Sequence, residues 1–139
     1  MFDFKFDWCK EMEIGVPIVD AQHQELFRIG RDLEQLIFRG QNATKQELLS
    51  LVCELREYIS YHFYTEEELM ATHNYPSLSQ HITSHNKFRT NIVDIDLPLL
   101  GQRPDLVLPQ IKESLQDFLF NHVLTEDKAL GIYIIKLAS

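Results

Sequence analysis

Histidine and carboxylate side chains at helical spacings are the residues in this sequence that could do chemistry. His62 and Glu66 are four residues apart, and so are His81 and His85, which puts each pair on one face of a helix. Five of the six histidines are candidate ligands: His23, His62, His81, His85 and His122. Imidazole together with carboxylate suits iron, zinc or copper, so these residue types indicate a metal site without choosing the metal.

Four amphipathic helical patterns must position these side chains. After an N-terminal arm at residues 1–19, the expected helices are 21–39, 45–72, 78–97 and 105–124. Asp20 is the predicted N-cap of the first helix, and capping boxes that begin at Thr44 and Ser77 open the second and third. Pro109 leaves the start of the fourth uncertain.

The arrangement expected from these helices is all-α. No segment alternates with period 2 as a half-buried strand would. Short connections between long amphipathic helices favour an up-down-up-down antiparallel four-helix bundle. With no linker, repeat or low-complexity stretch, residues 1–139 are predicted to form a single domain.

In such a bundle the starts of the first and third helices meet the ends of the second and fourth. His23 and the His81/His85 pair lie near starts, whereas the His62/Glu66 pair lies near an end, as does His122. A lone histidine on an apolar face is usually a core residue with one satisfied hydrogen bond. Burying this many polar groups in one layer is costly unless they pair or bind metal, so the sequence predicts a metal site. His73 lies beside a turn and is expected to lie outside that layer.

Asp127 is the carboxylate that is hardest to place. It comes five residues after His122, which puts the two side chains about 140° apart on an ideal α-helix. It can therefore join the layer only if the helix has ended or bent before it. Thr125 and the chain that follows allow this.

The size of the ligand set indicates two ions. A structural zinc takes four ligands, whereas seven suit two ions about 3.5–4 Å apart that share carboxylates. The His81/His85 pair lacks the glutamate of a zinc protease helix. Nor does the chain contain Glu-x-x-His, the motif of ferritin-like di-iron enzymes. A site dominated by neutral imidazoles favours binding of dioxygen over its use to oxidise substrates.

The pattern resembles the hemerythrin family, specifically its bacterial single-domain members. The resemblance covers nearly the whole chain and includes the Trp8 and Gly15-Val16-Pro17 arm. The matching motifs are Asp20-Ala21-Gln22-His23, His62-Phe63-Tyr64-Thr65-Glu66, the His81-x-x-x-His85 pair, and Asn121-His122-Val123 followed by Asp127-Lys128.

This resemblance implies two iron ions joined by a solvent-derived oxo or hydroxo bridge. The expected ligands divide into three sets: His81, His85 and His122 on one iron, His23 and His62 on the other, and Glu66 and Asp127 shared by both. The second iron would then have one vacancy, where dioxygen is expected to bind.

An apolar pocket is expected around that vacancy. Its residues are next to the ligands in sequence and are also ordinary bundle core: Leu26, Phe63, Phe118, Leu119 and Val123. An apolar lining would keep out water and anions that promote irreversible oxidation. Phe118 stands where the family often has tryptophan, which bears on the shape of the pocket and on the rate of oxygen release.

The resemblance leaves more than one function open. Reversible binding of dioxygen for carriage, storage or delivery, without enzyme activity, is the leading hypothesis, favoured by the full ligand set and the lack of a fused output domain. One alternative is a di-iron enzyme that reduces oxygen, peroxide or nitric oxide to protect the cell. Another is a sensor of oxygen or redox state.

Composition and charge limit the classes of partner that the protein is expected to bind. A formal net charge of −8 argues against nucleic acid or an anionic membrane as a main partner. No apolar run approaches the roughly 20 residues that span a bilayer, and the acidic start does not fit a signal peptide. Cys9 and Cys53 are most simply free thiols in a reducing cytoplasm, and Cys53 is expected on the outer face of its helix.

Overall fold

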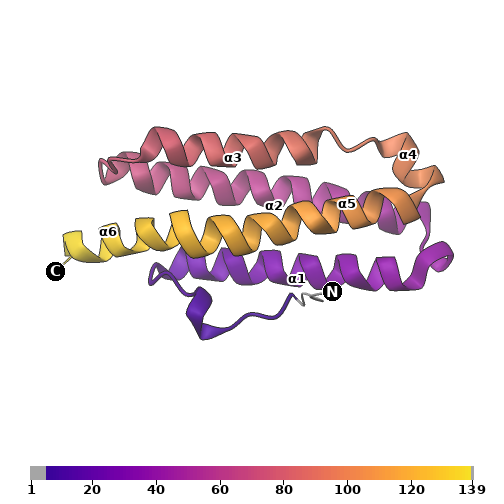
Figure 1. Ribbon diagram of the computed structural model, residues 1–139, viewed down its shortest axis with the longest axis horizontal. Helices are drawn as coiled ribbons and strands as arrows, with labels where there is room; N and C mark the ends of the chain where they lie inside the picture. The colour runs from indigo at the N-terminus through magenta and orange to yellow at the C-terminus, as the bar shows by residue number, and fades with distance from the viewer. Residues whose placement is uncertain (1–5, 139) are drawn as a thin grey trace.

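The computed structural model describes residues 6–138, which form an all-α bundle of long helices running alternately up and down (Figure 1). The first three long helices are α1 (Pro17–Arg39), α2 (Lys45–Thr72) and α3 (Leu78–Val93). The fourth is one continuous helical stretch made of α5 (Pro104–Asp117), the π-helical segment η3 (Phe118–Asp127) and α6 (Lys128–Ala138). The predicted fold class is confirmed.

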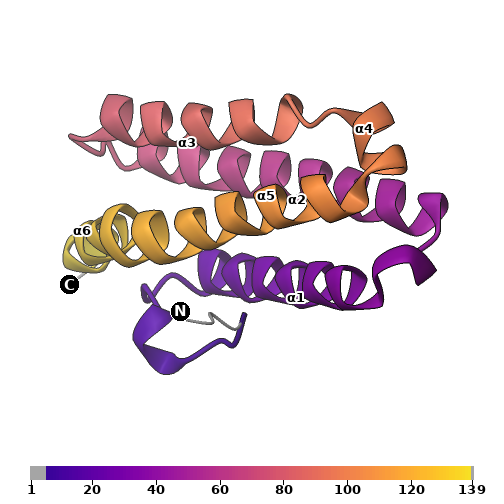
Figure 2. The ribbon, with the colours of Figure 1, turned by 45° about the vertical axis from the view of Figure 1, so that its right-hand side comes forward.

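The four long stretches lie side by side (Figure 2) and share one apolar core. α1 packs against α2 and α5, and α3 packs against α2, α5 and η3. The half of the bundle far from the α2–α3 turn is filled with apolar side chains, among them Leu33, Leu51, Leu108 and Ile111. Burial of such side chains is the main force that holds the helices together.

The first helix begins earlier than predicted. Val16 is its N-cap and Pro17 occupies the first helical position, where its missing N–H costs nothing. The expectation that Asp20 is the N-cap is wrong. Its carboxylate lies inside the first turn and instead accepts hydrogen bonds from the backbone N–H groups of Ile14 (2.8 Å) and Gly15 (3.1 Å). The expected arm of residues 1–19 therefore ends at residue 16, and its residues 1–5 lie outside the described part.

The ends of α1 and α2 follow the sequence signals. Gly40 closes α1 with a φ of 56°, and the predicted capping box of α2 is present between Thr44 and Glu47. A short 3-10 turn, η2 (Gly40–Asn42), joins the two helices, and another, η1 (Lys10–Met12), lies in the N-terminal segment. The second capping box is wrong, because the Ser77 side chain makes no capping hydrogen bond to α3.

The segment after α3 also differs from expectation. The predicted third helix, 78–97, ends at Val93, and a short helix, α4 (Leu97–Gln102), follows it. Asp96 caps α4 by accepting a hydrogen bond from the Leu99 N–H at 2.9 Å. A new N-cap followed by a proline in the first turn starts a separate helix instead of prolonging α3.

The fourth helix departs most from the prediction of 105–124. It starts at Pro104, contains Pro109 in its interior, and continues through the π-helical segment to Ala138. α6 approaches the N-terminal segment so closely that a Cβ on Gly131 would lie 2.9 Å from the Ile14 Cβ. The predicted end at 124 is therefore wrong, because the helix continues through the π-helical segment that carries two of the candidate ligands.

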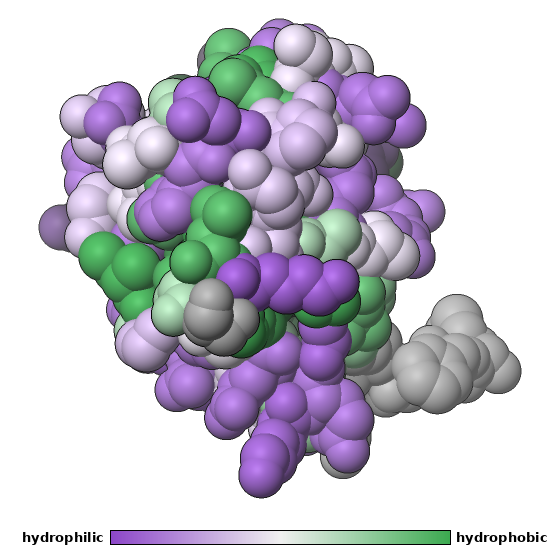
Figure 3. Space-filling model, turned by 90° about the vertical axis from the view of Figure 1, so that its left-hand side faces the viewer, coloured by the Kyte–Doolittle hydropathy of each residue, from purple (hydrophilic) through white to green (hydrophobic). Residues whose placement is uncertain are grey.

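The end of the bundle that carries α6 and the α2–α3 turn is mostly hydrophilic, with separate apolar patches (Figure 3). α6 contributes exposed apolar side chains, including Ile132 and Ile135. None of the helices within residues 6–138 is both long enough and apolar enough to cross a membrane.

Candidate metal centre

Seven polar side chains from all four long helical stretches meet in one buried layer near the α2–α3 turn. Each is exposed by 6% or less. α1 provides His23, α2 provides His62 and Glu66, α3 provides His81 and His85, and η3 provides His122 and Asp127. The layer expected from the helix positions is thus present.

Asp127 reaches this layer by a route that the sequence did not indicate. The helix neither ends nor bends away before it, but changes to π geometry from Phe118 to Asp127. In a π-helix the N–H of residue i+5 bonds to the C=O of residue i, so residues five apart lie on nearly the same face. His122 and Asp127 therefore point the same way, and the 140° separation of an α-helix does not arise.

The seven side chains form two groups that share their carboxylates. The three-histidine group consists of His81, His85 and His122 with Glu66 and Asp127. The two-histidine group consists of His23 and His62 with the same two carboxylates. In each group, one candidate ligand atom from every residue lies within 4.8 Å of all the others.

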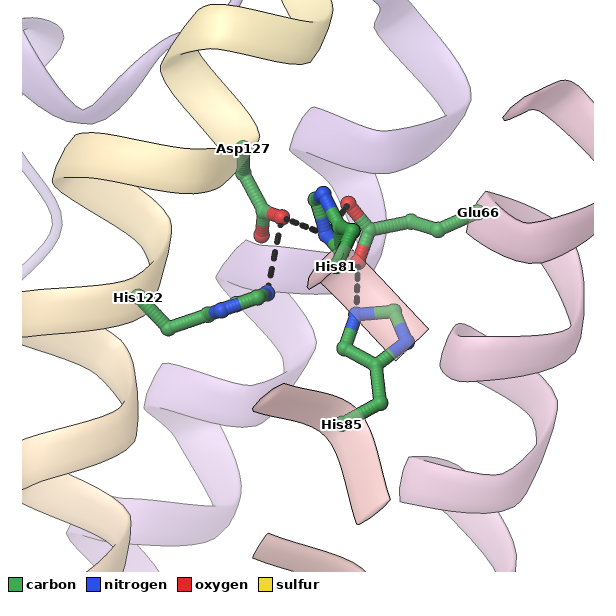
Figure 4. A group of neighbouring side chains, drawn as sticks. All are labelled: Glu66, His81, His85, His122 and Asp127. Atoms are coloured by element: carbon green, nitrogen blue, oxygen red, sulfur yellow. Dashed lines mark ion pairs between the residues drawn. The ribbon is translucent and has the colours of Figure 1, made fainter. Parts of the chain in front are cut away.

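Figure 4 shows how the three-histidine group converges on the carboxylates. The Nε2 atoms of His81 and His122 lie 2.8 and 3.0 Å from Asp127 Oδ1, and His85 Nε2 lies 3.3 Å from Glu66 Oε1. Across the layer, His23 Nε2 lies 2.9 Å from Asp127 Oδ2. The two oxygens of Asp127 thus face different histidine groups.

The donor atoms in this layer fit metal ions better than they fit one another. The Nε2 atoms of all five histidines and all four carboxylate oxygens are buried, yet none has a hydrogen-bond partner among residues 6–138. Short nitrogen–oxygen distances without hydrogen-bond geometry mean that the lone pairs converge on shared space. Leaving so many buried polar atoms unpaired would be very costly, and cations held between them remove that cost.

The protonation of these side chains follows from the same neighbours. Burial raises the pKa of Asp127, but the imidazoles of His122, His23 and His81 outweigh burial and hold that pKa well below its usual value. Burial lowers the pKa of His122, but Asp127 and Glu66 outweigh it and raise that pKa to about 9. Burial prevails at His62 and lowers its pKa. At neutral pH Asp127 is thus anionic and His122 protonated, so metal binding must displace a proton from His122.

Two hydrogen bonds orient His62 in the two-histidine group. Its Nδ1 lies 2.8 Å from Gln22 Oε1, and Gln22 Nε2 donates to Thr65 Oγ1 at 3.0 Å. An amide oxygen can only accept, so Nδ1 carries the proton and the lone pair of Nε2 faces the carboxylates. The other histidine of the group, His23, has a buried Nδ1 with no hydrogen-bond partner in the described part of the chain.

Two histidines of the three-histidine group are held by carboxylates. His85 Nδ1 lies 2.8 Å from Glu67 Oε2, and His122 Nδ1 lies 3.3 Å from Glu126 Oε1. Ligating histidines commonly use the second ring nitrogen in this way. Sequence reasoning gives no role to Glu67 or Glu126, although the four-residue spacing of His122 and Glu126 is a signal that could have found one.

The residues predicted to line an oxygen pocket are all buried. Phe63 stacks on His85 with ring centroids 3.8 Å apart, and Phe118 stacks on His122 at 4.9 Å. The two phenylalanines also contact each other at 5.4 Å. Leu26, Leu119 and Val123 belong to the same apolar core.

Two further sequence expectations concern residues outside the layer. His73 belongs to neither histidine group, and its Nδ1 bonds to the Leu69 carbonyl at 2.7 Å. Cys9 and Cys53 are free and exposed, as expected for surface thiols.

Comparison with known proteins agrees with the site. The family model for the hemerythrin HHE cation binding domain matches residues 14–131. A bacteriohemerythrin of Clostridium acetobutylicum is 24% identical over 124 residues, which cover 88% of this chain and 96% of that protein. A bacteriohemerythrin of Stenotrophomonas maltophilia is 27% identical over 122 residues, 88% of this chain and 76% of that protein. Since the family model spans most of the chain, this protein belongs to the hemerythrin family.

Proposed function

We propose that this protein holds two iron ions in the buried layer and uses them to bind dioxygen reversibly. The observation that carries the proposal is the division of the site into a three-histidine and a two-histidine group that share Glu66 and Asp127. Bound there, two iron ions would supply one electron each, reversibly, as dioxygen binding requires.

The unequal division supports dioxygen binding at the two-histidine group. The three-histidine group offers five protein ligands, whereas the two-histidine group offers four. One ligand position beside His23 and His62 is therefore left for an external molecule. A solvent-derived oxo or hydroxo bridge would complete the set that the family resemblance implies.

The surrounding residues support binding rather than further reaction. Phe63 and Phe118 stack on His85 and His122 of the three-histidine group, and their ring centroids also lie 5.8 and 6.5 Å from that of His62. With Leu26, Leu119 and Val123 they belong to the apolar core. Apolar surroundings exclude water and anions, and so slow the loss of the oxygen-binding state. A set of five imidazoles and only two carboxylates also gives less support to highly oxidised iron than a carboxylate-rich site does.

Repeated oxygenation tests this function directly. The anaerobic diferrous protein is exposed to oxygen and then purged, while its near-ultraviolet and visible absorption is followed over several cycles. We expect two iron ions per chain and a full return to the colourless state after each purge. Steady consumption of oxygen in the presence of added reductant would instead identify a reductase, and one ion per chain, or zinc, would overturn the site.

A further inference from the structure

The two histidine groups differ in what holds their outer ring nitrogens. In the three-histidine group, carboxylates face the Nδ1 atoms of His85 and His122. In the two-histidine group, the corresponding partner of His62 is the neutral amide of Gln22. The Nδ1 partner is thus a charged carboxylate in one group and a neutral amide in the other, on the same imidazole rings whose Nε2 atoms would bind metal.

The structure explains why an amide stands behind His62. The Thr65 hydroxyl gives its single proton to the Tyr61 carbonyl at 3.0 Å, so towards Gln22 it can only accept. Residue 22 must therefore donate to Thr65 while accepting from His62. A glutamine amide does both, whereas a carboxylate has no proton to give.

The carboxylates behind the other group also have second hydrogen-bond donors. Glu67 Oε2 accepts both from His85 Nδ1 and from the Arg89 guanidinium, at 2.8 and 2.9 Å. Glu126 accepts from the Ser84 hydroxyl at 2.7 Å. A carboxylate that accepts the Nδ1 proton makes the imidazole more basic, and a more basic imidazole binds a cation more tightly. Arg89 offsets part of the Glu67 charge, but it is itself partly exposed to solvent.

We propose that Glu67 and Glu126 make the three-histidine group the tighter metal subsite, and that Gln22 keeps the two-histidine group the weaker one. The first ion would then occupy the three-histidine group. The subsite with the open ligand position would fill second. Glu67, Glu126 and Gln22 are positioning residues that act through the histidines. The inference rests on the proposed function only in requiring that both groups hold a metal.

Stepwise binding of cobalt(II) to the metal-free full-length chain tests this assignment without oxygen. Affinities come from competition with a chelator, and the cobalt absorption bands report on each step. We expect two steps for the wild type. Glu67→Gln removes only charge, because one amide oxygen can accept from both His85 and Arg89 as Glu67 Oε2 does. It should weaken the first step about 10- to 100-fold and leave the second unchanged.

Two further variants and a control complete the design. Glu126→Gln should also weaken the first step, whereas Gln22→Glu should tighten the second about 10-fold. The carboxylate that Gln22→Glu introduces would need Thr65 to turn its hydroxyl away from the exposed Tyr61 carbonyl, which water can then satisfy. Glu68→Gln removes an exposed carboxylate from the same helix as Glu67 and should change neither step.

The outcomes separate this inference from the proposed function. It is overturned if Glu67→Gln and Glu126→Gln weaken binding no more than Glu68→Gln, or weaken both steps equally. A second step left unchanged or weakened by Gln22→Glu also contradicts it. If Gln22→Glu fails to fold, the two glutamate variants decide the matter. A wild type that binds only one cobalt ion would contradict the two-metal function instead.

Discussion

Gly131→Ala should destabilise the protein, although alanine is the better helix former. Gly131 lies buried in α6, where the last helix passes the N-terminal segment. A Cβ there would overlap the Ile14 carbonyl oxygen and lie 2.9 Å from the Ile14 Cβ and 3.0 Å from its carbonyl carbon. These are mainly backbone atoms, which cannot swing aside as the end of a long side chain can.

The expected loss follows from two opposing terms. Overpacking typically costs about 1–3 kcal/mol, and a clash with backbone belongs at the upper end, about 3 kcal/mol. Replacing glycine by alanine inside a helix returns about 1 kcal/mol. The net loss is about 2 kcal/mol, which lowers the melting temperature of a chain of this length by roughly 8 °C.

Thermal unfolding of the metal-free protein, followed by circular dichroism, measures this change. Gly101→Ala is the matched control, because a Cβ at Gly101 in α4 would meet only the Lys45 side chain, at 3.7 Å. That variant should gain about 0.4–1 kcal/mol. If Gly131→Ala is stabilised as much as Gly101→Ala, the close packing of α6 on Ile14 is refuted.

Other changes test the site and the helices around it. Glu66→Ala should weaken both cobalt steps, because Glu66 belongs to both groups, whereas His85→Ala should weaken one; one step kept at full affinity in Glu66→Ala would show that the carboxylate is not shared. Phe63→Ala should lower the free energy of unfolding in urea by about 3–5 kcal/mol, since the ring is fully buried, and a loss below about 1 kcal/mol would contradict its packing. Thr44→Ala should cost about 1 kcal/mol through the lost N-cap, whereas the same change at Thr83, exposed inside α3, should not. Removing metal with a chelator should lower the free energy of unfolding by about 2.7 kcal/mol for each subsite previously held at 100 times its Kd.

The fold and most of the layer could be predicted from local patterns. Hydrophobic periodicity and the Thr44 capping box located α2 to the residue, because both signals act within a few residues of the chain. The four-residue spacings of His62 with Glu66 and of His81 with His85 set each pair on one helix face. Antiparallel connection of the helices then put both pairs at the same end of the bundle.

Helix ends that depend on distant contacts were not predictable in this way. Asp20 has the residue type of an N-cap, yet the fold uses it to hold the backbone of Ile14 and Gly15. The contacts of His62 with Gln22 and of His85 with Glu67 were not predictable either, because they depend on how different helices pack. The contact of His122 with Glu126 is the exception, because these residues are four apart on the same helix.

The sequence by itself determined the all-α bundle and the convergence of five histidines with Glu66, because these follow from spacing along each helix and from antiparallel connections between helices. Only the tertiary structure decided the place of Asp127. An α-helix is the local preference of the chain, and it would turn Asp127 away from His122. The π-helical segment brings the two side chains together. On either side of it the chain is packed, α5 on α1 and α6 on Ile14, and these contacts join residues far apart in the sequence.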